Sequence, residues 1–196
     1  MNLNYEILLF IYEMSKKTFK KLLDARNAKK ENELLIAQDV TNDGIKQYRL
    51  FSSYDELEKE MKDRIKSGKD NHFYEIINFP CHFFVDIDLD EELDVEDALD
   101  EIRDFFKDEK MYVYTSGSKS YHLLFPNVIV KTRDDAREKC EEMVSHMKSK
   151  IKDYVDHSVY RNNGLFRMLG SSKKGKRKNK VVKDAPSDLK SSLVNI

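Results

Sequence analysis

The stretch CHFFVDIDLD, residues 81–90, carries an acid at every second position of an apolar run. Side chains alternate between the two faces of a strand, so Asp86, Asp88 and Asp90 would share one face. Like charges on one face repel, and a carboxylate without a partner is costly beside a core. The pattern therefore predicts that a cation neutralises these acids. A polar edge strand facing water shows the same alternation, and Asp90 is also consistent with the start of a loop.

The composition describes a globular protein. The chain has 196 residues, of which 36% are charged and 11% aromatic, and its formal net charge is -1. This length suffices for a proper core. The charge is unevenly distributed, because residues 171–183 (SSKKGKRKNKVVK) hold seven basic residues and no acid. A polyanion would be sought there, although a charge run is more commonly a solvated basic loop.

The cysteines and the first residues bear on the compartment. Cys81 and Cys140 are isolated and form no CxxC motif, which fits a reducing, intracellular compartment. The nucleus, the cytoplasm and a viral replication site all remain open. The opening MNLNYEILLFIYEM lacks a basic start and contains Glu6 and Glu13. These features argue against a signal peptide or membrane span, so no membrane partner is expected.

Hydrophobic periodicity and turn residues predict the order of the elements. Helices are predicted at 3–30, 53–67, 95–106 and 132–151, and strands at 33–38, 45–51, 72–79, 82–89, 111–116 and 120–125. From residue 82, this order favours an α/β (α+β) fold with a sheet of the RRM or ferredoxin type, covered by helices on one face. We expect one continuous domain, with a smaller N-terminal α/β lobe (1–70), a core (71–180) and a C-terminal tail (181–196).

Three short stretches in or beside predicted strands carry chemistry: Asp86-Ile-Asp88, Ser120-Tyr-His122 and Val155-Asp156. A folded sheet can bring all three to one face. Carboxylates favour hard divalent cations, Mg²⁺ or Mn²⁺, over zinc. Two metals shared by three acids stabilise the attacking and leaving oxygens in phosphoryl transfer.

The Ser120/His122 pair does not fit nucleophilic catalysis. Two residues apart on a strand, their Cα atoms lie about 7 Å apart, and no Gly-x-Ser-x-Gly elbow is near. Together with Lys119 they suit contacts to phosphate oxygens, although a partly buried structural histidine remains an alternative. Arg167 lies among apolar residues, so its guanidinium is expected to be held in place, where it suits a triphosphate.

These residues together resemble the archaeo-eukaryotic primase superfamily, in particular its PrimPol and herpesvirus-type or large-DNA-virus branch. Its three signatures, a D-x-D strand, an S-x-H strand and a later single Asp, occur here in that order. The resemblance extends to the flanking segments FSSYDEL, FYEIINFPCHFFVDIDLD and VYRNNGLFRMLGSSKKGKR, and spans roughly residues 45 to 180. It implies the primase fold.

The resemblance also implies roles for particular residues. Asp86, Asp88 and Asp156 would be the catalytic residues and the ligands of Mg²⁺ or Mn²⁺, with no zinc expected. The expected nucleotide contacts are Lys119, Ser120, His122, Arg167 and Lys173. The remaining basic residues near these motifs are expected to contact nucleic acid, namely Arg161, Lys174, Lys176 and Arg177.

We therefore expect a metal-dependent, template-directed nucleotidyltransferase of DNA replication, either a DNA primase or a primase-polymerase. Its partners would be a single-stranded DNA template and NTPs or dNTPs. A replicative helicase or a zinc-binding module, in another chain or in a missing segment, is a further possible partner. A metal-dependent nuclease and a non-catalytic nucleic-acid-binding domain remain as alternatives.

Overall fold

The computed structural model describes residues 17–39, 45–69, 71–90, 93–115, 119–172 and 180–196. The chain divides into two compact units, Met1–Tyr74 and Glu75–Ile196. Strand β4 (Phe73–Ile76) contributes residues to both units. No helix within the described ranges is long and apolar enough to cross a membrane.

In its described residues, the first unit contains an antiparallel sheet and two helices. Strand β2 (Leu34–Asp39) pairs with β3 (Lys46–Phe51), which confirms the two predicted strands; the predicted turn at 42–44 lies outside the described residues. Helix α3 (Tyr54–Lys66) begins as predicted at Ser53, whose Oγ accepts a hydrogen bond from Glu56 N at 3.1 Å.

The predicted helix over 3–30 is wrong in its described part. Thr18 and Phe19 form strand β1, which pairs with β3, and only α2 (Leu22–Ala28) is helical. The backbone of this segment finds hydrogen-bond partners on the edge of β3, and Lys17 O accepts from Leu50 N at 3.0 Å. Such tertiary pairing outweighs local helix propensity, which is a weak determinant. Residues 3–16 of the predicted helix lie outside the described ranges.

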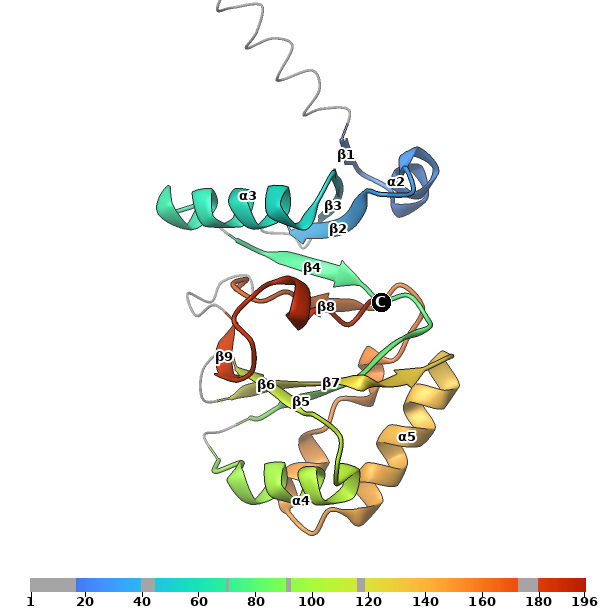
Figure 1. Ribbon diagram of the computed structural model, residues 1–196, viewed down its shortest axis with the longest axis vertical. Helices are drawn as coiled ribbons and strands as arrows, with labels where there is room; N and C mark the ends of the chain where they lie inside the picture. The colour runs from blue at the N-terminus through green and yellow to red at the C-terminus, as the bar shows by residue number, and fades with distance from the viewer. Residues whose placement is uncertain (1–16, 40–44, 70, 91–92, 116–118, 173–179) are drawn as a thin grey trace, which may run out of the picture. The chain divides into compact units, whose positions relative to one another are not determined.

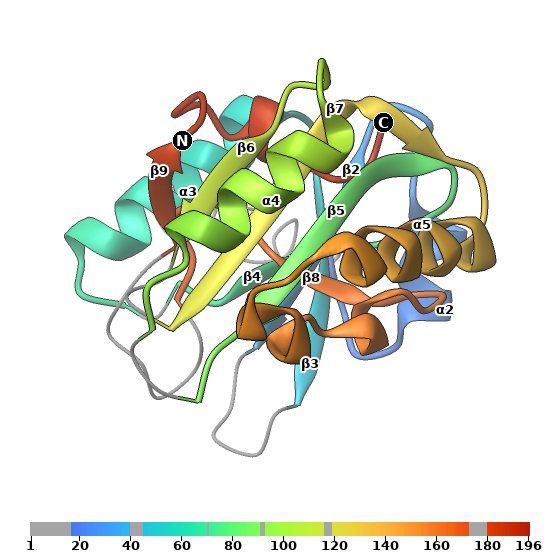
Figure 2. The ribbon, with the colours of Figure 1, turned by 90° about the horizontal axis from the view of Figure 1, so that it is seen from below.

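The second unit contains a four-stranded antiparallel sheet in the order β5-β7-β6-β9. Its strands are β5 (Cys81–Asp88), β6 (Tyr112–Thr115), β7 (Ser120–Val130) and β9 (Val181–Asp184). Helices α4 (Glu96–Phe106) and α5 (Arg133–His146) cover one face of this sheet, as Figures 1 and 2 show. The mixed α/β fold with helices on one face is the predicted fold class.

Several element boundaries differ from the prediction, and β4, for example, ends at Ile76 instead of residue 79. Strand β7 continues past residue 125 to Val130, and its pairing with β5 shifts register between His82 and Phe83. Helix α5 ends at His146, and a 3-10 helix (Lys150–Tyr154) follows it. Boundaries are set by capping and tertiary contacts that hydrophobic periodicity does not encode.

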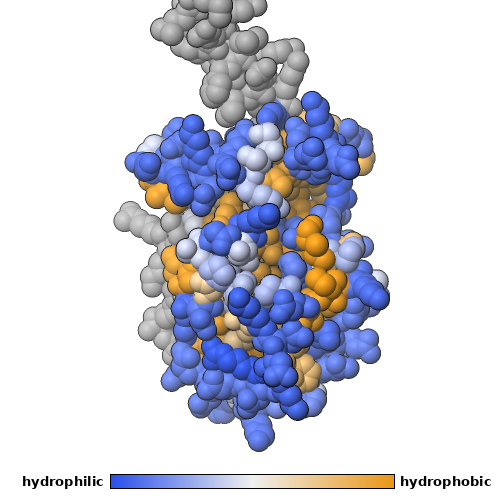
Figure 3. All heavy atoms as spheres, viewed as in Figure 1, coloured by the Kyte–Doolittle hydropathy of each residue, from blue (hydrophilic) through white to orange (hydrophobic). Residues whose placement is uncertain are grey.

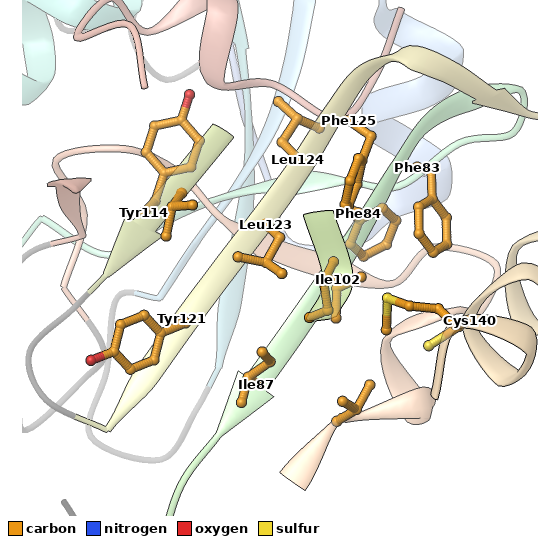
Figure 4. Packing of buried hydrophobic residues seen from close by; sticks show 14 of the residues in the cluster. Phe83, Phe84, Ile87, Ile102, Tyr114, Tyr121, Leu123, Leu124, Phe125 and Cys140 are labelled. Atoms are coloured by element: carbon orange, nitrogen blue, oxygen red, sulfur yellow. The ribbon is translucent and has the colours of Figure 1, made fainter. Parts of the chain in front are cut away.

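Part of the core of the second unit, shown in Figure 4, lies between the sheet and its helices. Phe83 of β5 contacts Phe125 of β7 and Phe106 of α4, with ring centroids 5.5 Å apart in both pairs. Ile102 of α4 and Cys140 of α5 are fully buried in the same cluster. In the view of Figure 3, the region of α4 and α5 presents mainly hydrophilic residues to solvent. The periodicity of these amphipathic elements thus separates core from surface.

The opposite face of this sheet carries strand β8 (Leu165–Arg167) and the aromatic rings near it. Phe84 packs against Tyr160 and Phe166, with ring centroids 5.1 and 4.7 Å away. The Tyr160 hydroxyl donates a hydrogen bond to the Phe84 carbonyl oxygen. These contacts fix β8 against the strand that carries the paired acids.

Residues 181–196, expected as a C-terminal tail, lie within the second unit. Strand β9 pairs with β6, and Val194 O accepts from His82 N of β5 at 2.8 Å. Backbone hydrogen bonds of this kind require a partner strand, which the polar local sequence did not indicate. The segment therefore forms part of the framework that positions the sheet.

Gly164, at the start of β8, leaves no room for a side chain. A Cβ there would lie 2.8 Å from Val159 O and 3.0 Å from Arg161 O, both backbone atoms. We expect Gly164→Ala to lower the free energy of unfolding by about 1 to 3 kcal/mol in urea titrations, because the turn must move to relieve overlap. Arg161→Ala, which truncates an exposed side chain of the same turn, should change it by less than about 0.5 kcal/mol. Equal midpoints for both variants would contradict this account.

Candidate metal and nucleotide site

The register of β5 and β7 places the predicted motifs opposite each other. Asp86 pairs with His122, and Asp88 pairs with Ser120. Because side chains alternate along each strand, all four lie on the face opposite α4 and α5. Asp88 is exposed, whereas Ser120 and His122 are buried. The D-x-D and S-x-H motifs therefore form one continuous row of polar groups.

Asp86 is the most electrostatically perturbed of the three predicted acids. Its Oδ1 is buried and accepts no hydrogen bond from any described residue, and His122 Nε2 lies 3.6 Å away. Burial, together with the nearby charges of Asp88 and Asp156, raises its pKa to about 7, although Arg167 opposes the shift. The charged form of Asp86 is therefore poorly compensated by the protein alone.

Asp156 is anchored to the exposed edge of β5. Val155 forms a bridge to Ile87, and Asp156 N donates to the Asp86 carbonyl oxygen at 2.8 Å. The Asp156 side chain is half-buried, and its Oδ1 accepts from Ser158 N at 2.8 Å. The backbone thus holds the third predicted acid beside the first, and its charge acts on Asp86.

Arg167, at the end of β8, lies over the S-x-H motif. Its Nη2 is 3.2 Å from Ser120 Oγ and 3.3 Å from His122 Nε2, and the residue is buried. Phe166 supports this arrangement from the side, because its ring lies 4.5 Å from the His122 ring. A guanidinium held in this way presents its remaining N–H donors in a fixed geometry, which suits phosphate oxygens.

The other predicted contacts lie at the ends of these strands or outside the described residues. Lys119 precedes β7, is exposed, and its Nζ donates to the Asp90 carbonyl oxygen at 2.5 Å. Arg161 is exposed in the turn before β8. The other basic residues predicted to contact nucleotide or nucleic acid lie in the segment 173–179, outside the described ranges: Lys173, Lys174, Lys176 and Arg177.

The donor set suits a hard cation. Within the described ranges, no group of three or more His, Cys, Asp or Glu side chains is arranged to enclose a metal ion. Mg²⁺, however, is commonly bound by one or two carboxylates together with substrate phosphates and water. The buried Asp86 oxygen without a hydrogen bond, next to two further carboxylates, fits such a partial ligand set. Asp86, Asp88 and Asp156 are the residues that would hold the cation.

Two buried charged residues of this region were missed by sequence reasoning. Lys180 is fully buried behind Arg167, and Glu75, at the end of β4, is fully buried as well. Lys180 looked like one more base in a lysine-rich run. Glu75 did carry a signal, since it is an acid between apolar neighbours in a predicted strand (FYEII), where a lone carboxylate needs partners.

Comparison with solved structures identifies the fold of the chain as that of primase catalytic domains. The catalytic domain of the primase RepB′, solved in complex with initiator DNA, matches with a TM-score of 0.52 and 14% identity over 78% of this chain and 77% of that one. A second structure, of primase RepB′, matches with a TM-score of 0.51 and 16% identity over 78% of this chain. The match covers 51% of that second chain.

A family model gives the relationship at the sequence level. Residues 45–183 match the model described as the C962R protein N-terminal AEP domain, where AEP denotes archaeo-eukaryotic primase. The chain therefore belongs to this family of the archaeo-eukaryotic primase superfamily, which confirms the predicted resemblance. No curated protein matches the chain significantly. Family and fold together support a nucleotidyltransferase function of the primase type.

Proposed function

We propose that this chain is a metal-dependent, template-directed nucleotidyltransferase that joins NTPs or dNTPs on a single-stranded DNA template, as a DNA primase or primase-polymerase. One observation carries the proposal: the carboxylates of Asp86 and Asp88 face Ser120 and His122 across two strands, with Arg167 above them. A site for a cation and a site for anionic phosphates therefore adjoin each other. That combination is what transfer of a nucleotidyl group requires.

The residues divide into two groups by their chemistry. Asp86, Asp88 and Asp156 would bind Mg²⁺ or Mn²⁺, which neutralises charge at the reacting phosphate and assists the attacking 3′ hydroxyl. Ser120, His122 and Arg167 would orient the triphosphate of the incoming nucleotide, because they supply a preorganised set of polar donors away from water. We infer that Lys119 and Lys173 add charge at the edges of this group.

Template contact is assigned to basic residues outside the reaction centre. Arg161 is exposed before β8, and Lys174, Lys176 and Arg177 follow in the sequence. Basic side chains of this kind contact the phosphate backbone of DNA, so the affinity for DNA should fall steeply as the salt concentration rises. Base pairing with the template would then supply the sequence information. A replicative helicase or a zinc-binding module is the partner class that we propose for recruitment to DNA.

A template-dependent synthesis assay tests the proposal. Wild-type protein with labelled ATP or dATP, Mn²⁺ or Mg²⁺, and single-stranded DNA is expected to form products whose composition follows the template. The double variant Asp86→Ala/Asp88→Ala should form none, because the carboxylates that bind the cation are gone. Asp104→Ala, an exposed acid of α4, is the matched control and should retain activity. Absence of metal-dependent product from the wild-type protein would refute the proposed function.

A further inference from the structure

Lys180 is a buried lysine directly behind Arg167, one of the residues proposed to bind the nucleotide. Only 1% of the residue is exposed. Its Nζ donates a hydrogen bond to the Arg167 carbonyl oxygen at 2.8 Å and lies 4.5 Å from the centre of the Phe166 ring and 5.0 Å from that of Tyr114. Burying an ammonium group is costly unless such contacts compensate for the lost water. The ammonium thus binds both residues at the end of β8.

Glu75 supplies the opposite charge. Its carboxylate accepts hydrogen bonds from the backbone N–H groups of Val194 and Asn195, at 2.8 and 3.1 Å. Burial raises the pKa of Glu75 and lowers the pKa of Lys180, while the attraction between the two groups opposes both shifts. The two groups therefore interact electrostatically within the second unit, and the charge of Asp86 also favours the ammonium form of Lys180.

The backbone of Lys180 is tied to the same region. Its N–H donates to Ser171 O at 2.7 Å, and its carbonyl oxygen accepts from Gly170 N at 2.8 Å. Residues 170 and 171 are therefore joined to residue 180 by two backbone hydrogen bonds. Lys180 contacts Gly170 and Ser171 through its backbone and Arg167 through its side chain.

We propose that Lys180 is a positioning residue for nucleotide binding, which holds the end of β8 so that the Arg167 guanidinium stays on Ser120 and His122. This inference rests on the proposed function. The ammonium group holds Arg167 through its carbonyl oxygen. It holds His122 indirectly, because it contacts the Phe166 ring, which packs against the His122 ring. Lys180 is buried behind these groups and would not touch the substrate itself.

The test compares Lys180→Met with Lys183→Met. Methionine keeps most of the length of the side chain but removes its charge and its hydrogen bond. Lys183 lies three residues further on, in β9, is partly exposed and pairs with Glu96 of α4, so its substitution is a matched control. We expect Lys180→Met to weaken binding of a fluorescent ATP analogue with Mn²⁺ about tenfold and to raise KM more than it lowers kcat, whereas Lys183→Met binds as wild type does.

Removing one member of a buried charge pair can impair folding. The variant Lys180→Met/Glu75→Gln therefore serves beside the single substitution, because glutamine keeps an acceptor for the N–H groups of Val194 and Asn195. Circular dichroism and thermal unfolding establish that each variant is folded. The same loss of nucleotide affinity is expected in the double variant.

A double-mutant cycle separates positioning from general destabilisation. If Lys180 acts through Arg167, Lys180→Met should cause no further loss of affinity in an Arg167→Leu background. Equal losses in both backgrounds, or wild-type affinity in folded Lys180→Met/Glu75→Gln, would overturn the inference while leaving the proposed function intact. A wild-type protein that neither binds the analogue nor synthesises product would instead overturn the proposed function, and the inference with it.

Discussion

Asp86→Asn is expected to abolish nucleotide transfer and, at the same time, to stabilise the metal-free protein at pH 8. The substitution removes a predicted metal ligand, so kcat/KM should fall at least about 100-fold. It also removes a charge whose Oδ1 is buried without a hydrogen bond from the described residues. We expect the free energy of unfolding to rise by about 1 to 3 kcal/mol, measured in denaturant without divalent cations.

The sign of the pH dependence follows from the direction of the pKa shift. In the folded protein the pKa of Asp86 is about 7, above the value of 3.8 for an unperturbed Asp. Between these values the folded chain holds a proton that the unfolded chain releases, so stability falls as pH rises from about 4 to about 7. The advantage of Asp86→Asn over wild type should therefore be small at pH 4 and complete by pH 8.

Divalent cations should make the wild-type protein more stable than Asp86→Asn, the reverse of the order expected without metal. A cation that binds only the folded state stabilises it by mass action. Mn²⁺ is thus expected to raise the melting temperature of the wild-type protein and to have little effect on Asp86→Asn. Asp104→Asn, on the exposed side of α4, is the control for the loss of one acid. If Asp86→Asn is less stable than wild type at pH 8 without metal, the account of an uncompensated charge fails. If Asp86→Asn gains as much stability from Mn²⁺ as wild type does, the assignment of Asp86 as a ligand fails.

The sequence predicted the placement of the candidate site residues on one face of the sheet, but not their surroundings. The period of two along a strand correctly placed Asp86 with Asp88, and Ser120 with His122, on one face. The register between β5 and β7 determines which of these residues lie opposite each other, and no local sequence pattern predicts that register. The contact of Arg167 with the S-x-H motif depends on how β8 packs over the sheet, and the sequence indicated only that its guanidinium would be held in place.

The errors have the same origin in tertiary contacts. Thr18 and Phe19 were predicted as helix because their neighbours have helical periodicity, yet they pair with β3. Lys180 has the same local sequence character as the lysines before it, and only its contacts with Arg167 and Phe166 distinguish it. Burial of a charged residue depends on partners distant in the sequence, such as Glu75, and is invisible to a pattern of charges.

Arg167→Leu is expected to have the second large effect, a rise in the KM for the incoming nucleotide of about 10- to 100-fold. The guanidinium is held by Ser120 and His122, so its loss removes charge-assisted hydrogen bonds to phosphate and the order of the groups around them. Arg167→Lys should recover only part of the affinity, because an ammonium group lacks the planar fork of donors. Arg133→Leu, at the exposed start of α5, is the control and should leave KM unchanged.

The same variant separates a primase from a nuclease that uses the same acids. A nuclease cleaves a phosphodiester and has no need of a triphosphate site, so Arg167→Leu would spare its metal-dependent cleavage of DNA. A primase would lose nucleotide affinity in binding titrations and synthesis in extension assays, to a similar extent in both.

Arg167 also lowers the pKa of Asp86, so in the Arg167→Leu variant a higher pH should be needed to ionise that carboxyl. The pH at which synthesis reaches half of its maximum is therefore expected to rise in Arg167→Leu, and an unchanged profile would argue against coupling between the two groups.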